Sequence, residues 1–142
     1  MSLGVTNLDE ALCGSGTSGN SELCKYFVSL GATDFDGALN GSSAIGNLEL
    51  CKYFVSLGAT DFDRVLRRSA RMDDPEICKY LISLGATNLD ELLYSSFKWG
   101  RYEVCKYLVS LGATDFNTDE VSEYYKSNLD YVESELKRRN MI

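Results

Sequence analysis

Five cysteines are the residues of this sequence best suited to chemistry, because a thiolate can ligate a metal ion, form a disulfide or act as a nucleophile. Cys24, Cys51, Cys78 and Cys105 recur at intervals of 27 residues, and Cys13 lies outside that series. Metal-binding cysteines usually occur in close pairs such as CxxC, and histidine, the commonest general base, is absent. We therefore expect four buried, reduced structural cysteines, one free thiol at Cys13, and no metal or other cofactor.

A cluster of arginines is the second group suited to a specific task. Guanidinium groups bind carboxylates and phosphates through paired hydrogen bonds. The cluster is unusual because the chain has a net charge of −7. Its members have the spacing i, i+3, i+4, i+7 that places side chains on one face of a helix: Arg64, Arg67, Arg68 and Arg71. We expect this face, flanked by Tyr94 and Lys98, to bind an acidic or phosphorylated segment of a protein partner.

Both the arginines and a nearby group of aromatic residues have a second interpretation. The arginines can instead pair with Asp63, Asp73 and Glu91 and only offset local acidic charge. Exposed aromatic residues are typical of binding hot spots, but Phe97 and Trp99 can equally fill space beside the last repeat. The aromatic group consists of Tyr94, Phe97, Trp99 and Tyr102.

These residues belong to a sequence that repeats. The segment CKY(F/L)(V/I)SLGAT recurs every 27 residues, and its lysine and tyrosine never change. Self-similarity with a fixed period of about 20–50 residues predicts stacked repeats, and we expect the unchanged lysine stems to lie along the stack. The period predicts a single domain over residues 1–142, divided into a partial N-terminal repeat (1–29), three repeats (30–56, 57–83 and 84–110) and a C-terminal capping repeat (111–142).

Each repeat is predicted to begin with one helix. A hydroxyl residue followed three positions later by an acid is the spacing of a capping box, which marks a helix start. In the second repeat these residues are Thr33 and Asp36, and the apolar residues that follow are spaced for one helical face. The other pairs with this spacing are Thr6 with Asp9, Thr60 with Asp63, and Thr87 with Asp90.

A second helix follows in each repeat. Asn47 is a favoured N-cap residue, and Asp74 followed by Pro75 is a stronger start signal of the same kind. Gly58 lies just after the CKYFVSL segment, where a left-handed residue commonly ends a helix. No segment alternates between apolar and polar residues as a strand does, so the sequence predicts an all-α fold of helix hairpins.

The two ends of the array differ. After residues 128–132, which stay in register with the repeats, residues 133–139 become largely charged. One apolar and one polar face predict a C-terminal cap, which stacked repeats need. No second helix precedes Gly4, so we expect the N-terminal edge to be unprotected.

Residues 46–59 resemble the second helix of an ankyrin repeat, with a glycine turn, a Leu-Glu-Val-Val-Lys-type helix and a terminal Gly-Ala. Ankyrin units have about 33 residues, about six more than these repeats, and their Thr-Pro-Leu-His tetrapeptide is absent here. The missing length falls where ankyrins carry a β-hairpin finger. The resemblance implies a fingerless, right-handed α-solenoid of stacked helix-turn-helix repeats.

The resemblance also implies a non-catalytic protein–protein interaction module that binds through its first helices. Sequence variation is concentrated on the positions of those helices that we expect to face outward. Gly41, for example, is equivalent to Gly14, Arg68 and Ser95, and Gly37 is equivalent to Arg64. The alternative is a structural or self-assembling array, or a fragment of a longer repeat protein, with weak self-association through the N-terminal edge.

Other classes of function are disfavoured. Against an enzyme stand the absence of histidine and of a phosphate-binding glycine loop, and the carboxylates named for such an enzyme are Asp119 and Glu123. The acidic balance argues against nucleic-acid binding, which requires a basic face. No apolar run approaches the roughly 20 residues that span a bilayer, and no signal segment is present. We therefore expect a cytoplasmic protein in a reducing compartment.

Overall fold

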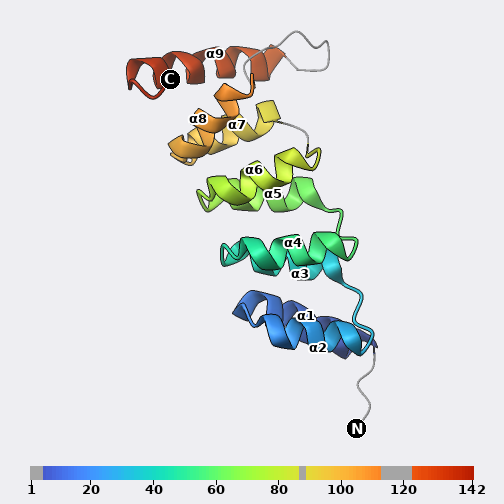
Figure 1. Cartoon of the computed structure of the whole chain (residues 1–142). Helices are drawn as coiled ribbons and strands as arrows, with labels where there is room; N and C mark the ends of the chain where they lie inside the picture. The colour runs from blue at the N-terminus through green and yellow to red at the C-terminus, as the bar shows by residue number, and fades with distance from the viewer. Residues whose placement is uncertain (1–4, 87–88, 113–122) are drawn as a thin grey trace. The chain divides into compact units, whose positions relative to one another are not determined.

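The structure, a computed structural model, describes residues 5–86, 89–112 and 123–142, with side chains for 7–86, 89–112 and 130–142. Within these ranges all regular secondary structure is α-helical, which confirms the all-α prediction for this part of the chain (Figure 1). The chain forms two compact units, Met1–Arg68 and Ser69–Ile142. The prediction of a single repeat domain stays a prediction.

The first unit contains two helix hairpins and most of a fifth helix. In each hairpin, consecutive helices pack against each other, and α1 also packs extensively on α3. The hairpins are the blue and cyan-to-green elements of Figure 1. The helices are α1 (Val5–Ser18), α2 (Ser21–Ser29), α3 (Phe35–Ala44), α4 (Leu48–Ser56) and α5 (Phe62–Arg71), and the boundary between the units falls within α5.

The predicted capping box of Thr33 and Asp36 does not cap α3. The N-cap of α3 is Asp34, whose Oδ1 accepts a hydrogen bond from the Gly37 N–H at 2.9 Å. Thr33 lies one residue too early for this role, and Thr6 lies inside α1. Thr87 is outside the described residues. The starts of α1, α3 and α5 were predicted to within two residues, but the capping residue of α3 was wrong.

The acid of the predicted capping box, Asp36, has a different task. Oδ1 of Asp36 accepts hydrogen bonds from the backbone N–H groups of Thr60 at 2.7 Å and Asp61 at 3.0 Å, just before α5. Asp9 makes the same pair of bonds, at 2.7 and 3.0 Å, to the two residues before α3. This aspartate therefore ties the first helix of one repeat to the start of the next first helix.

The second helices that follow Asn47 and Asp74 begin and end as predicted. The side chains of Asn47 and Asp74 accept hydrogen bonds from the N–H groups of Leu50 at 3.1 Å and Ile77 at 3.2 Å. Asn20 caps α2 in the same way. At the other end, each helix is followed by a left-handed glycine with φ of 108°, 116°, 101° and 83°: Gly31, Gly58, Gly85 and Gly112.

In its described residues the second unit contains four helices and the end of α5. In this unit α7 packs on both α8 and α9, and α8 also contacts α6. The helices are α6 (Pro75–Ser83), α7 (Leu89–Lys98), α8 (Tyr102–Ser110) and α9 (Glu123–Arg138) (Figure 1). On α9, Val132 and Leu136 are buried, whereas Lys137 and Arg138 are exposed and form ion pairs. The helix thus has the apolar and polar faces expected of a cap.

The turn between α5 and α6 departs from the others at one residue. Gly19, Gly46 and Gly100 occupy the left-handed region in the equivalent turns, with φ of 74°, 70° and 71°. In this turn the residue is Asp73, with φ of 57°. Aspartate tolerates this conformation better than most residues, although glycine adopts it without a steric penalty.

Candidate functional site

Helix α5 has one buried and one exposed face, as the arginine spacing predicts. Four small or apolar side chains form the buried face: Val65, Leu66, Ser69 and Ala70. The exposed face consists of the four predicted arginines: Arg64, Arg67, Arg68 and Arg71. The period of the helix therefore presents all four guanidinium stems away from the core.

The partner of Arg64 differs from the acids considered above. Its Nε lies 2.9 Å from Oδ2 of Asp61, the residue before the helix, and its side chain remains 59% exposed. An exposed pair at this spacing contributes only about 0.3–0.5 kcal/mol. Within the part of the chain that the structure describes, Arg68 has no ion pair. The two guanidinium groups are thus accessible to a partner.

Arg71, Tyr94 and Lys98 belong to the second unit, whereas the other three arginines belong to the first. The guanidinium carbon of Arg71 lies 5.9 Å from the centre of the Trp99 ring, and Nζ of Lys98 lies 5.3 Å from that of Tyr94. Both are cation–π distances. Of the predicted residues, the structure therefore brings Tyr94 and Lys98 together, and Arg71 contacts an aromatic residue that was left out of the predicted site.

The aromatic group divides between the two interpretations. Phe97 makes edge-to-face contacts with Tyr102 and with Tyr131 of α9, both at 6.0 Å between ring centres. Arg139 donates a hydrogen bond to the Tyr102 hydroxyl at 3.0 Å. Phe97 and Tyr102 are half-buried where α7 meets α8. Tyr131 and Trp99, in contrast, are 60% and 40% exposed and do not fill the interior.

The prediction that the variable first-helix positions face outward is wrong for α3. A Cβ atom on Gly41 would lie 2.6 Å from Thr17 Oγ1, and one on Gly37 would lie 2.7 Å from Cys13 Sγ. Both glycines therefore face α1 at close range. At the equivalent Gly14 an added Cβ would meet no atom within 4 Å. The same position of the repeat thus contacts a neighbouring helix at Gly41 but meets open space at Gly14.

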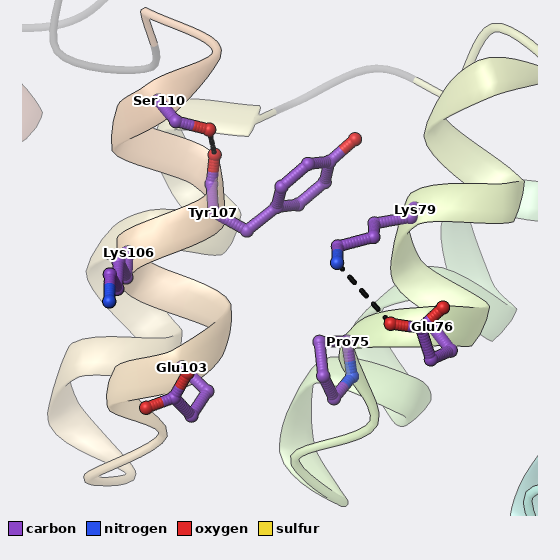
Figure 2. Close-up of a pocket in the computed structure, with 7 residues that line it drawn as sticks. All are labelled: Pro75, Glu76, Lys79, Glu103, Lys106, Tyr107 and Ser110. Atoms are coloured by element: carbon purple, nitrogen blue, oxygen red, sulfur yellow. Dashed lines mark hydrogen bonds and ion pairs between the residues drawn. The ribbon is translucent and has the colours of Figure 1, made fainter.

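A groove with a volume of about 430 Å³ lies between α6 and α8. In Figure 2, Lys79 of α6 and Tyr107 of α8 face each other across it; the lysine Nζ is 5.4 Å from the ring centre. The groove is lined by Pro75, Glu76, Lys79, Glu103, Lys106, Tyr107 and Ser110. Most of these are repeated residues, and two acids balance two lysines. The groove therefore offers no excess of either charge to a ligand, and the expectation that the lysine stems lie along the stack stays a prediction.

The cysteines occupy structural positions. Cys24, Cys51, Cys78 and Cys105 are buried, and all five cysteines are free, as predicted. Burial raises the pKa of Cys78 and of Cys105 to about 12. Burial and the nearby Asp34 carboxylate, whose Oδ2 is 3.6 Å from Sγ, raise the pKa of Cys13 to about 11. These three thiols are therefore protonated at neutral pH and are poor nucleophiles.

Two further candidates for chemistry concern acidic residues. The described residues include no group of three or more His, Cys, Asp or Glu side chains that could hold a metal ion. Asp119 lies outside the described residues, and so does the side chain of Glu123.

Among the helices that the structure describes, none combines the length and the apolar character needed to cross a membrane.

Comparison with known proteins assigns no family or function to this chain. No protein-family model matches the sequence, and no curated protein matches it.

Proposed function

We propose that this protein is a fingerless, ankyrin-like repeat module without catalytic activity, which binds an acidic or phosphorylated segment of a partner protein. The binding face is the exposed side of α5. One observation carries the proposal: four arginines lie exposed on one face of a ten-residue helix in a chain whose net charge is −7. The 27-residue period supports a single domain of stacked repeats, and the resemblance to ankyrin repeats supports a right-handed α-solenoid. The buried free cysteines support a reducing, cytoplasmic setting.

The chemistry of the face favours an anionic segment over other partners. Guanidinium forks pair with carboxylates and phosphates in two parallel hydrogen bonds. Arg64 and Arg68 lie one helical turn apart on the exposed face. An extended acidic segment can therefore meet successive guanidinium groups as it follows the helix.

Reversing the charge of Arg67 and Arg68 is expected to weaken this binding about tenfold or more, because each charge-assisted hydrogen bond contributes roughly 1.5–3 kcal/mol and is replaced by repulsion. The measurement is fluorescence anisotropy of labelled glutamate-rich and phosphoserine-containing peptides with the wild-type chain and the Arg67→Glu/Arg68→Glu variant. Affinity should also fall as salt is added.

A matched control is Lys25→Glu/Lys106→Glu, which changes the net charge equally on exposed positions of second helices. It should retain most of the affinity, and all variants should melt near the wild-type temperature. Equal losses in both double variants would indicate a general charge effect and contradict a site on α5. Unchanged binding by the arginine variant would contradict the proposal outright.

A second candidate function, self-assembly, rests on an exposed apolar face of α2. Leu23 is 43% exposed and Tyr26 is 55% exposed. At the positions equivalent to Leu23, Leu50 is 3% exposed, and Ile77 and Val104 are fully buried. A face that is buried in the later repeats is thus open in the first one. A second copy of the chain is suited to cover it, since the same apolar residues would meet across a twofold axis.

Self-assembly predicts that the wild-type mass measured by light scattering rises with protein concentration, whereas Leu23→Glu stays monomeric. The reason is that a buried, unpaired carboxylate at the contact would oppose association. Leu23 is exposed in the single chain, so the variant should keep the wild-type melting temperature. A wild-type chain that is monomeric throughout the concentration range removes this candidate.

A further inference from the structure

One turn position carries a large exposed apolar residue in three consecutive repeats. It is the residue just after the first helix, and its equivalent in the first repeat is Ser18. Ile45 is 45% exposed, Met72 is 59% exposed and Trp99 is 40% exposed. Single exposed apolar residues are ordinary, but an apolar patch bordered by polar groups marks an interaction surface. Met72 and Trp99 both belong to the second unit.

In the second unit this apolar position lies beside positive charge. Arg71 precedes Met72 in the chain, and its guanidinium group lies over the Trp99 ring at 5.9 Å. Lys98, which is exposed, directly precedes Trp99. Arg71 is thus the chain neighbour of Met72 and lies over the Trp99 ring, and Lys98 is the chain neighbour of Trp99.

Two acids follow Met72 in the chain. Asp74 caps α6 through Oδ1, which accepts the Ile77 N–H at 3.2 Å. Oδ1 of Asp73 is buried and has no hydrogen-bond partner among the described residues. Both acids are half-buried, whereas Arg71 and Lys98 are exposed.

We propose that Met72 and Trp99 receive an apolar side chain of the acidic partner segment, while Arg71 and Lys98 pair with the carboxylates or phosphates on either side of it. This inference rests on the proposed function and specifies its partner as an acidic segment with an apolar anchor. A ring already covered on one face by a guanidinium offers a rigid surface to an aliphatic or aromatic side chain. An acidic flank neutralises the cations that would otherwise disfavour burial of that side chain.

Trp99 makes the surface directly observable, because it is the single tryptophan of the chain. The probes are three short peptides: glutamates flanking a central leucine, the same peptide with serine in place of leucine, and the leucine peptide with lysines in place of glutamates. The leucine–glutamate peptide is expected to shift the Trp99 emission to shorter wavelength. It should bind about tenfold more tightly than the serine peptide, since a leucine side chain leaves water. The lysine peptide should not bind.

Met72→Ser should weaken the leucine–glutamate peptide about fivefold and leave the serine peptide unchanged. The matched control is Ile45→Ser, which alters an equally placed exposed residue of the first unit and should have no effect. Met72→Leu should restore the wild-type affinity. Because Met72 is exposed, none of these variants is expected to unfold the chain.

The outcomes separate this inference from the proposed function. If both acidic peptides bind equally, with sensitivity to Arg67→Glu/Arg68→Glu but not to Met72→Ser, the apolar anchor is overturned and the proposed function remains. If neither acidic peptide binds, both are overturned. Met72-dependent binding of the lysine peptide contradicts the charge assignment. Trp99 emission that changes with protein concentration alone shows that a second copy covers the surface, which also overturns the inference.

Discussion

Replacement of Gly41 by leucine is expected to lower the free energy of unfolding by about 2–3 kcal/mol, because it overpacks a close contact between two helices. An added Cβ would lie 2.6 Å from Thr17 Oγ1 and 3.3 Å from both the Cys13 carbonyl oxygen and the Thr17 nitrogen. The threonine cannot turn away freely, since its hydroxyl donates to the Cys13 carbonyl at 3.0 Å. The remaining carbons of leucine would force α1 away from α3. Thermal and urea denaturation of the full chain measure the effect.

The chain provides its own control at the equivalent position. Gly14 lies inside α1, and an added Cβ there would meet no atom within 4 Å. Gly14→Ala should therefore raise the free energy of unfolding, by up to about 1 kcal/mol, because alanine has the higher helix propensity. A Gly41→Leu chain as stable as the wild type would show that α1 and α3 do not approach this closely.

Removing the Asp36 carboxylate is expected to cost about 2 kcal/mol of stability. Its Oδ1 accepts the N–H groups of both Thr60 and Asp61, and a hydrogen bond to a charged group contributes roughly 1.5–3 kcal/mol, less where water can replace it. Asp36→Ala leaves two N–H groups at the start of α5 without this acceptor. Urea denaturation measures the change in the free energy of unfolding. Amide hydrogen exchange at Thr60 and Asp61 should accelerate.

Asp36→Asn distinguishes geometry from charge. Both bonds use the same oxygen, so the amide oxygen of asparagine can accept them with loss of the negative charge alone. We expect asparagine to retain more than half of the stability that alanine loses. If asparagine and alanine are equally destabilising, charge rather than the acceptor position is responsible. If neither changes the stability or the exchange rates, Asp36 does not link the two repeats.

Local signals predicted the second helices well. Asn47 and Asp74 accept N–H groups three residues away, and Gly58 ends α4 with φ of 116°, as their types and positions indicate. These interactions lie within one turn of the chain. The same rule failed at Thr33 because Asp34, one residue later, provides an equally good acceptor. Pattern spacing alone does not choose between two adjacent capping residues.

The candidate site was predicted in part. The arginine spacing on α5 was sufficient to identify its exposed face, because helical period and burial agree there. The sequence presents Trp99 as one of several aromatic residues. It also shows that Ile45, Met72 and Trp99 occupy the same turn position of three repeats. Whether that position is buried or exposed depends on neighbouring elements. The sequence pattern therefore left the residue's role open.

The sequence by itself determined the 27-residue period, the helices, the ends of the second helices and the amphipathic character of α5, because each depends on residues within about one helical turn of one another. Only the tertiary structure decided that Asp36 bonds Thr60, 24 residues away, and that Gly41 packs on α1 while Gly14 meets open space. Identical positions acquire different surroundings in successive repeats. The physical reason is that contact between helices depends on what the neighbouring repeat presents, which a repeat's own residues do not specify.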